Sequence, residues 1–581
     1  MALPSKKSHQ FDLSTLTLVL TASAWLAACG GGGGGSSDPV TPPPGVPAAL
    51  TLGGTAATGA ALANRPVDAK CAAGTAAPVN TGADGKYTLT ITGGALPCVL
   101  RATAADGSVL HSLATGSGAT ATANITTASE LVVASLAGGA AAGLFSSFDA
   151  ASVTEAKVQA AITAVSDTLK AAGIDLTAIG NPLTAALVAA NGSTAGNDFD
   201  KALDALKAKL VATGTTLATL ADSVAKASPN VAPANLSNTP SLPAALMLQP
   251  KAANCDALRS GRYRLVVNAI GDGNAPATQV VTIDATRLTI TNAAGEVAQL
   301  TANGACRYRT PSNGDSVVSP AGMIVAQIGY GPQGSALKGG VFFPEQTHPL
   351  ASLAGDWNLI GLDRTEDNGP IHLTAASGSI GADGKLTTFS QCDNVISCVA
   401  GTTAELAPFA FSVNTAGGFN FTYGDPTDIS RVFAYRSGGG ELVWVMLSKN
   451  GHIQFATRKV ALTLPTVGRV SEGASLTLTP QYTAPFAISD YKNTIRSVDA
   501  TANSFLRDAV SNLTTGVTRP ERFAINQPRD GYSRRTGEAV TDSAGQPSTV
   551  QEFVAMGLRG TGVTPVAFLG SNQLVLSVSK P

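Results

Sequence analysis

The sequence predicts a mainly β multidomain protein, with an N-terminal β-sandwich, a short α-helical bundle and a large C-terminal antiparallel β-barrel or sandwich region. Three observations support this fold class. Short alternating segments separated by glycines recur along most of the 581 residues, as in antiparallel β proteins. One stretch, 126–226, shows helical periodicity instead. The 44% of hydrophobic residues is enough to build several cores, and the length predicts about three to four domains.

Changes in composition divide the chain into six segments. We expect an export signal at 1–28, a Gly/Pro-rich tether at 29–47, a β-sandwich at 48–125, an Ala-rich helical domain at 126–226, a Pro-rich linker at 227–254 and one or more antiparallel β domains at 255–581. The net charge is −1. Because nucleic-acid binding needs a strong positive field, we expect no nucleic-acid partner.

The N-terminus has the layout of a bacterial export signal. Lys6 and Lys7 form a short basic region, and an apolar run follows from 13 to 28. The run ends in Leu26-Ala27-Ala28-Cys29, which resembles the lipobox of bacterial lipoproteins. The resemblance implies that the Cys29 thiol receives lipid, with acyl chains such as palmitate, and that the mature chain begins there. The alternative is an ordinary signal peptide that is cut nearby and leaves Cys29 unmodified.

The residues after Cys29 suit a tether between a membrane and a folded domain. The run from Gly30 to Gly35 is flexible, and the prolines between Pro39 and Pro47 stiffen the following part. Gly30, rather than Asp, after the cysteine resembles lipoproteins that are sent to the outer membrane. We therefore expect a lipid-anchored protein of the bacterial cell envelope, at the outer membrane. Its partner through acylated Cys29 would be the lipid bilayer.

The other cysteines form an even set, as disulfides in an oxidising compartment do. Pairing within each proposed domain selects Cys71–Cys98, Cys255–Cys306 and Cys392–Cys398. A metal site is a poor alternative, because no C-x-x-C occurs and no His lies near any Cys. A catalytic Cys would also need a His partner. We therefore predict three disulfides and no metal, cofactor or catalytic residue.

Residues 48–125 form short predicted strands separated by glycines. Asp84-Gly85-Lys86-Tyr87 predicts a turn followed by an alternating strand. Together with Gly53-Gly54-Thr55 in an earlier strand, this pattern resembles the carboxypeptidase regulatory-like domain, a transthyretin-type β-sandwich. The resemblance implies an accessory module with no chemistry of its own. Cys71 and Cys98 are not part of the family pattern and would be a local staple.

Between 126 and 226, apolar residues recur at helical spacing. Two capping boxes predict helix starts, at Thr127-Ala128-Ser129-Glu130 and at Ser152-Val153-Thr154-Glu155. Asn181-Pro182 predicts another helix that runs to Ala190. The apolar stripes are Val158, Ile162, Val165 and Leu169; then Phe199, Leu203, Leu206 and Leu210; then Leu217, Leu220 and Val224. These stripes could bind a partner helix or lipid, but packing on one another is the simpler interpretation.

The region 255–581 contains many segments that alternate in polarity, as antiparallel strands do. Gly355-Asp356-Trp357 looks like the Gly-x-Trp motif that opens lipocalin-type barrels, and a Trp packed under any sheet is the alternative. Similar segments at 261–265 and 355–359 indicate a weak repeat of two β units. No structure is predicted for 488–548.

Motifs that carry a reaction mechanism are missing from the sequence, including G-x-S-x-G, H-E-x-x-H and the Walker loop. Residues 329–334 match G-x-G-x-x-G, but Pro332 removes a backbone N–H that could face a phosphate, so a hairpin loop is the better interpretation. One charged cluster could serve acid–base or Ca²⁺ chemistry, although a solvated loop is simpler: Asp363, Arg364, Glu366 and Asp367.

Two further groups of residues are weak site candidates. Glu345 and His348 could line a barrel mouth, although a turn is the simpler interpretation. An arginine-rich stretch could bind anionic glycans or lipid headgroups: Arg519, Arg522, Arg529, Arg534 and Arg535, with Phe523 and Tyr532. Glu521 and Asp530 dilute its charge, so we expect a solvated face.

The function predicted from these observations is that of an envelope-anchored, non-enzymatic binding or scaffold protein. Its partner could be an envelope glycan, a protein or a small apolar ligand. One alternative is a small-ligand carrier that uses the C-terminal barrel. Another is a glycan-active hydrolase with two carboxylates. A carrier requires an apolar cavity, a hydrolase requires two carboxylates in one cleft, and a scaffold requires an exposed apolar or aromatic patch.

The anchor can be tested at its thiol. We expect Cys29→Ser to move the protein from the membrane fraction to the soluble fraction, because no acyl chain can then be attached. Cell fractionation with immunoblotting measures this shift. Mass spectrometry of the native protein should find a mature chain that starts at acylated Cys29. Retention of the variant in membranes, or a native start elsewhere, would contradict the prediction.

Overall fold

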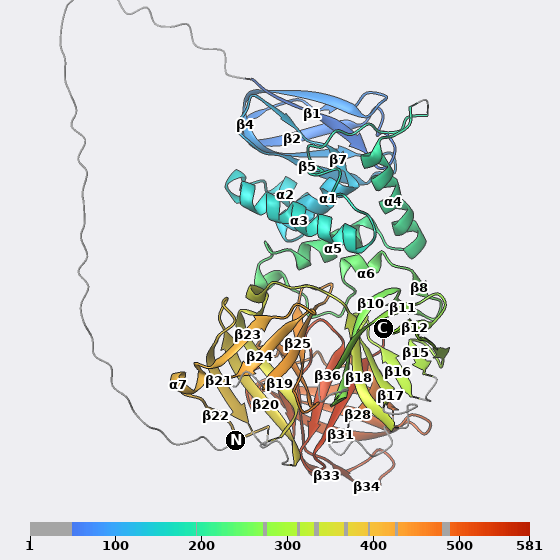
Figure 1. Cartoon of the computed structure of the whole chain (residues 1–581), viewed down its shortest axis with the longest axis vertical. Coiled ribbons are helices and arrows are strands. Elements are labelled where there is room, and N and C mark those ends of the chain that lie inside the picture. The colour runs from blue at the N-terminus through green and yellow to red at the C-terminus, as the bar shows by residue number, and fades with distance from the viewer. Residues whose placement is uncertain are drawn as a thin grey trace, which may run out of the picture. The chain divides into compact units, whose positions relative to one another are not determined.

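The computed structural model describes residues 49–192, 194–270, 276–310, 314–330, 336–364, 370–392, 395–424, 428–478 and 488–581. Strands dominate these residues (Figure 1), which confirms the predicted fold class. Cys29 and the rest of the expected signal and tether lie outside the described residues. In the described ranges, no helix has both the length and the apolar character that a membrane crossing requires.

A seven-stranded β-sandwich forms the first described part of the chain. Its strands are β1 (Ala49–Ala57), β2 (Pro66–Thr75), β3 (Val79–Asn80), β4 (Lys86–Thr103), β5 (Val109–Ala114), β6 (Thr120–Thr122) and β7 (Ile125–Thr126). Alternation in β4 buries Tyr87, Leu89 and Ile91 on one face. Tyr87 donates its hydroxyl to the Ala123 carbonyl. A Cβ on Gly54 would lie 2.1 Å from that same oxygen, so only glycine fits there.

Five helices follow, and they pack on one another and on the sandwich. They are α1 (Thr127–Ala137), α2 (Ala141–Ser146), α3 (Glu155–Ala171), α4 (Asp198–Thr213) and α5 (Leu217–Ala227). Most of the residues of the predicted apolar stripes are buried. Leu131 of α1 shares one core with Val165 of α3 and with Val99 and Leu113 of the sandwich. The stripes therefore serve internal packing.

Two helix starts differ from the predicted capping boxes. The N-cap of α1 is Thr126, because Thr126 and Ser129 each bind the backbone N–H of the other with their side-chain oxygens, at 3.0 and 2.8 Å. Glu130 instead accepts a 2.7 Å hydrogen bond from the His111 N–H. The N-cap of α3 is Thr154, whose hydroxyl accepts from the Lys157 N–H at 3.4 Å.

The helix predicted from Asn181-Pro182 to Ala190 does not form, so that prediction was wrong. The chain makes a turn there and then runs in irregular conformation. Asn124 of the sandwich donates its backbone N–H to the Leu183 carbonyl at 2.7 Å and its side-chain N–H to the Ala185 carbonyl at 2.7 Å. External donors thus bind carbonyl groups that a helix would satisfy internally.

The Pro-rich segment 227–254 packs against the helices through one set of side chains and against the first β unit through another. It contains a short helix, α6 (Ala244–Met247), with a buried Leu246. Its backbone also bonds to the later β region: the Ser237 N–H donates to the Gly439 carbonyl at 2.9 Å, and the Ser241 carbonyl accepts from the Gly438 N–H at 2.9 Å.

After the short pair β8 (Lys251–Ala252) and β9 (Cys255–Arg259), a nine-stranded antiparallel sheet follows. We call it the first β unit. Its strands are β10 (Gly261–Ile270), β11 (Pro276–Asp284), β12 (Thr289–Thr291), β13 (Val297–Gln299), β14 (Thr301–Ala302), β15 (Arg307–Arg309), β16 (Asp315–Val318), β17 (Ile324–Tyr330) and β18 (Ala336–Pro344). The first strand, β10, pairs with the last, β18, and the unpaired edges are β13 and β14.

A second nine-stranded sheet, the second β unit, repeats this topology. Its strands are β19 (Gly355–Arg364), β20 (Ile371–Ile380), β21 (Leu386–Cys392), β22 (Val399–Ala400), β23 (Phe409–Val413), β24 (Phe419–Tyr423), β25 (Ile429–Arg436), β26 (Leu442–Leu447) and β27 (Ile453–Arg458), with the short helix α7 (Thr403–Leu406). Again the first and last strands pair, and the edges are the fourth and fifth strands. The weak repeat at 261–265 and 355–359 therefore marks two units of the same strand order.

The third β unit is a closed eight-stranded barrel. Its strands are β28 (Val470–Leu478), β29 (Ile488–Asp499), β30 (Ser504–Asn512), β31 (Val517–Ile525), β32 (Ser533–Arg535), β35 (Phe553–Ala555), β36 (Val563–Phe568) and β37 (Gln573–Ser579). A separate hairpin is formed by β33 (Glu538–Thr541) and β34 (Pro547–Val550). Residues 488–548, for which no structure was predicted, thus supply strands of the barrel.

The central strands of the β units, such as β26, are buried on both faces. In β26, even-numbered side chains such as Trp444 point into the interior of the second unit. Odd-numbered side chains such as Val445 point into a larger core. That larger core also contains Val341 of the first unit and Leu476 of the barrel, and we call it the shared core. One face of each unit therefore packs against the other units, and the opposite face encloses its own interior.

The described residues contain the three disulfides that we predicted: Cys71–Cys98, Cys255–Cys306 and Cys392–Cys398. Cys71 and Cys98 lie opposite each other in the paired strands β2 and β4. Cys71–Cys98 lies within the sandwich, Cys255–Cys306 joins β9 to the first β unit, and Cys392–Cys398 lies within the second β unit. Each cross-link limits the conformational freedom of the unfolded chain.

The two repeated units open with the same contact. The Tyr263 hydroxyl donates to the Arg259 carbonyl at 2.9 Å, and Trp357 Nε1 donates to the Leu353 carbonyl at 2.6 Å. In both cases the acceptor lies four residues earlier. The Arg458 guanidinium lies 3.9 Å from the centre of the Trp357 ring, a cation–π geometry.

Gly355, the first residue of β19, leaves little room for a side chain. Its φ is +121°, and a Cβ would lie 2.7 Å from Arg458 Nη1. We expect Gly355→Ala to destabilise the second unit by about 1–3 kcal/mol, because it adds backbone strain and displaces the guanidinium. Gly139→Ala is the matched control, since no atom lies within 4 Å of its added Cβ. Urea unfolding followed by tryptophan fluorescence measures both variants, and equal unfolding midpoints would refute this account.

Candidate functional site

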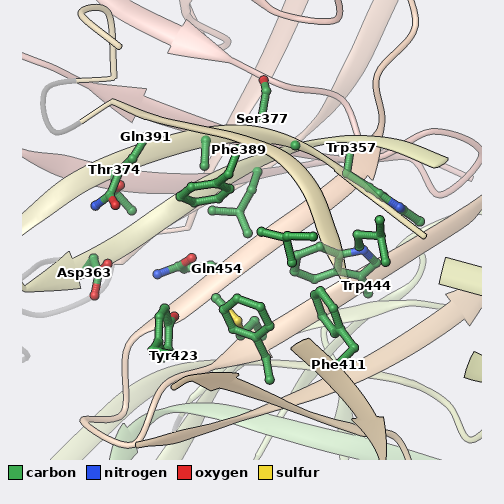
Figure 2. Close-up of a pocket in the computed structure, with 17 residues that line it drawn as sticks. Trp357, Asp363, Thr374, Ser377, Phe389, Gln391, Phe411, Tyr423, Trp444 and Gln454 are labelled. Atoms are coloured by element: carbon green, nitrogen blue, oxygen red, sulfur yellow. The ribbon is translucent and has the colours of Figure 1, made fainter. Parts of the chain in front are cut away.

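An apolar cavity lies in the interior of the second β unit (Figure 2). Its volume is about 70 Å³. That is several times the roughly 10–15 Å³ that one water needs, and it is below the ~300–1,000 Å³ of sites for whole drug-sized ligands. Six aromatic residues line it: Trp357, Phe389, Phe411, Phe421, Tyr423 and Trp444. The cavity therefore fits a small apolar group, such as the end of a short chain.

Aromatic packing fixes the walls of the cavity at one end. The ring centres of Trp357 and Trp444 are 5.7 Å apart. Those of Phe411 and Trp444 are 5.8 Å apart in an edge-to-face arrangement, and those of Phe411 and Phe421 are 4.7 Å apart. Such contacts hold the rings in defined orientations. Trp357 and Trp444 are 3% and 4% exposed, so both indoles are buried at this end.

The other end of the cavity is polar and carries Asp363, Tyr423 and Gln454 (Figure 2). Burial raises the pKa of Asp363, and the nearby charge of Asp428 adds to the rise. Burial also raises the pKa of the Tyr423 hydroxyl. The Gln454 amide donates to the Leu362 carbonyl at 3.2 Å. Both titratable groups are thus shifted toward their uncharged forms, which suits a neutral polar atom of a ligand more than a charged one.

A second cavity, of about 550 Å³, lies in the first β unit. Leu265, Val281 and Phe342 form part of its apolar wall, whereas Glu296 and Val297 lie at its rim. Val297 is 64% exposed, which shows that this cavity is open to solvent. It lacks the dense aromatic lining of the cavity in the second unit.

The charged cluster predicted after Trp357 is only partly described. Asp363 lines the cavity. Its carboxylate accepts a 2.8 Å hydrogen bond from the Arg364 N–H, while Glu366 and Asp367 lie outside the described residues. Asp363 is the one carboxylate among the described residues that line this cavity. A hydrolase mechanism that needs two facing carboxylates finds no second one in this lining.

Glu345 and His348 have structural roles rather than lining a barrel mouth. Glu345 accepts two hydrogen bonds from Arg264, at 3.0 and 2.6 Å. His348 Nε2 lies 2.9 Å from the Gln346 side-chain oxygen. Burial, together with the charge of Arg436, lowers the pKa of His348 to about 3, so the ring is neutral at pH 7. Neither residue lines the two cavities described above.

The arginine-rich stretch does not form one solvated face, so that expectation was wrong. The strands of the barrel turn alternate side chains to opposite sides, so Arg519 and Arg522 of β31 face different environments and the five arginines have several different partners. Arg519 and Arg535 bind Glu521, Arg534 binds Glu552, Arg529 contacts the Cys392–Cys398 disulfide, and Arg522 is exposed.

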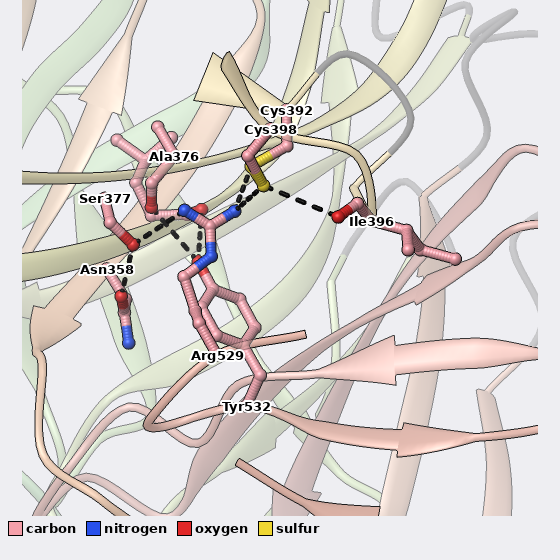
Figure 3. Close-up of a disulfide and its surroundings, with 9 residues drawn as sticks. Asn358, Ala376, Ser377, Cys392, Ile396, Cys398, Arg529 and Tyr532 are labelled. Carbon is pink, nitrogen blue, oxygen red and sulfur yellow. Dashed lines mark hydrogen bonds between the residues drawn. A yellow bond between two sulfur atoms is a disulfide. The ribbon is translucent and has the colours of Figure 1, made fainter. Parts of the chain in front are cut away.

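Arg529 joins the barrel to the wall of the second unit (Figure 3). Its guanidinium contacts the sulfurs of Cys392 and Cys398 and donates to the Ser377 hydroxyl at 2.9 Å. The neighbouring Tyr532 hydroxyl lies within hydrogen-bond distance of the Ala376 carbonyl, at 3.2 Å. Ser377 and Ala376 also line the aromatic cavity. The barrel therefore supports the back of the cavity wall.

The G-x-G-x-x-G segment and possible metal ligands are the remaining candidates from the sequence. The G-x-G-x-x-G segment continues beyond Tyr330, where residues 331–335 are outside the described ranges. It connects the paired antiparallel strands β17 and β18, as the hairpin interpretation requires. In the described parts of the chain, no group of three His, Cys, Asp or Glu side chains is suited to hold a metal ion.

Most of the cavity residues were not predicted as a site. Only Trp357 and Asp363 had been singled out in the sequence. The available signal was the alternation of aromatic residues in 409–413 and 419–423, which places Phe411 and Phe421 on one face of the sheet. That alternation does not indicate which face is internal.

The buried His452 makes stability depend on pH. His452 is 1% exposed, and burial, with the charges of Arg364 and His372, lowers its pKa to about 4. Between pH 6.5 and 4 the unfolded state binds a proton that the folded state does not, so stability falls as the pH falls. Over this pH window we expect the free energy of unfolding to fall less in His452→Gln than in the parent protein, by up to about 3 kcal/mol. Urea unfolding at several pH values measures this. If the free energy of unfolding depended on pH equally in parent and variant, the prediction would be contradicted.

Comparison with known proteins gives little further information. No family model matches the sequence, and no curated protein matches it. A structure of a protein of unknown function from the DUF3598 family of Nostoc punctiforme PCC 73102 is 10% identical, with a TM-score of 0.15, over 40% of this chain and 99% of that chain. A mutant of the vaccine antigen Transferrin Binding Protein B from Haemophilus parasuis Hp5 is 9% identical, with a TM-score of 0.17, over 55% of this chain and 75% of that chain. At these TM-scores neither likeness supports a conclusion on fold or function.

Proposed function

We propose that this chain is a lipid-anchored protein of the bacterial envelope that binds the apolar end of a small ligand inside its second β unit. The observation that supports the ligand is the cavity whose aromatic end is lined by Trp357 and Trp444 and whose polar end is at Asp363. A ligand with a short apolar group and a neutral polar atom matches both ends. The signal and lipobox at Cys29 support the location.

The exposed surface favours a ligand carrier over a scaffold. A scaffold would present a contiguous apolar or aromatic patch to its partner. The large hydrophobic side chains that are exposed among the described residues are valines and one leucine, with no aromatic residue among them. The aromatic side chains of the second unit are instead turned inward around the cavity.

Tryptophan fluorescence reports directly on this cavity. The chain has 3 tryptophans, and Trp25 lies in the expected signal peptide. The other two, Trp357 and Trp444, both line the cavity. A heavy atom in contact with an indole quenches its emission. Bromobutanol, which carries bromine on a short alkyl chain, is therefore a suitable probe of the lipoprotein reconstituted in phosphatidylcholine vesicles.

We expect bromobutanol to quench the protein in a saturable manner, and Ala376→Leu to remove the saturable part. Ala376 is 3% exposed and lines the cavity, so a leucine there occupies the ligand space. The matched control is Ala400→Leu on the exposed strand β22 of the same sheet. Quenching that rises linearly in the parent, or equally in both variants, would show only partition into the lipid and would refute the proposal.

A further inference from the structure

The interior of the closed barrel contains a charged cluster with more cations than anions. Glu521 is 1% exposed and faces Arg507 directly across the paired strands β30 and β31. Arg507 donates two hydrogen bonds to Glu521 Oε2, at 2.9 and 2.7 Å. Oε1 accepts from Arg535 at 2.6 Å and from Arg519 at 3.2 Å. Three guanidinium groups thus share one carboxylate, and we call these four residues the arginine cluster.

The arginine cluster has a net positive charge of two, from three cations and one anion. In the described part of the chain, the salt bridges of Arg507, Arg519 and Arg535 all go to this one carboxylate. Burial would raise the pKa of Glu521, but the three arginines more than offset this and hold the pKa below its usual value. The carboxylate is therefore ionised and already saturated with donors.

The two sides of the arginine cluster differ in their access to solvent. The side chains of Glu521 and Arg535 are 2% and 5% exposed. Those of Arg507 and Arg519 are 22% and 28% exposed. Arg519 Nε has no acceptor among the described residues. The buried carboxylate thus lies beside two partly exposed guanidinium groups, and Arg519 keeps one buried N–H that has no acceptor among the described residues.

Aromatic rings hold two of the three guanidinium groups, those of Arg507 and Arg535, in place. Arg507 lies 4.4 Å from the centre of the Phe523 ring, and Arg535 lies 4.1 Å from that of Phe553. Phe505 stacks on Phe523 with ring centres 5.0 Å apart. Because Arg507 is held before any ligand arrives, an anion that binds it loses little energy to reorganisation. The apolar surroundings of these two groups also strengthen the positive field at this end of the barrel.

We propose that the arginine cluster binds an anionic group of phosphate or carboxylate type through Arg507 and Arg519. Planar guanidinium groups match such oxyanions with paired hydrogen bonds. This site is separate from the aromatic cavity of the second unit, and the proposal does not depend on the ligand of that cavity. The anion could be a free solute or the headgroup of an acidic lipid.

The test uses the lipoprotein in phosphatidylcholine vesicles, titrated with inorganic phosphate at fixed ionic strength by calorimetry. We expect saturable binding that weakens about tenfold or more in Arg519→Gln, as for the loss of a charged hydrogen bond. Arg522→Gln is the matched control, because Arg522 is exposed on the same strand. Glu521→Gln should bind phosphate more tightly than the parent, since it removes the internal competitor.

A second arm distinguishes the source of the anion. The unfolding temperature is compared in phosphatidylcholine vesicles with and without phosphatidylglycerol. An increase with phosphatidylglycerol that is lost in Arg519→Gln assigns the site to a lipid headgroup. Phosphate binding that needs Arg519, without this increase, assigns it to a free anion. If neither anion binds, or if Arg519→Gln and Arg522→Gln behave alike, the proposal is overturned.

Discussion

Burial of the central β strands on both faces is the constraint on which the rest of the structure depends. Each strand that contacts the shared core gives alternate side chains to that core and to the interior of its own unit, as Val445 and Trp444 do in β26. Because side chains alternate along a strand, the register that places one set in the shared core also places the other set in the interior of the unit. A shift of register by one residue would place the aromatic lining of the cavity in the shared core.

The shared core explains how contacts between units support a site inside one of them. Tyr532 of the barrel is fully buried and reaches the Leu359 carbonyl of β19 at 2.9 Å. Arg529, three residues earlier, reaches Ser377 of β20. Both contacts are made from the outer side of the strands whose inner side forms the cavity wall. The wall is thus held in position by another unit, which favours a preformed site.

The two repeated units have diverged within the same topology. Both open with a ring that binds a carbonyl four residues earlier, through Tyr263 in one and Trp357 in the other. The second unit lines its small cavity with aromatic rings, whereas the cavity of the first unit is larger and has few aromatic residues in its lining. The barrel uses its interior differently again, for the charged residues around Glu521.

The sequence by itself determined the fold class, the three disulfide pairs, the helical stripes and the repeat at 261–265 and 355–359, because these depend on local periodicity and on short spacings. Only the tertiary structure decided what each face of a strand meets. Arg519 and Arg522 look alike in the sequence, yet one binds the buried Glu521 and the other is exposed. Likewise Asn181-Pro182 has a local helix signal, but donors from the sandwich bind the carbonyls that follow. Long-range partners settle such choices, and they are not encoded in the neighbouring residues.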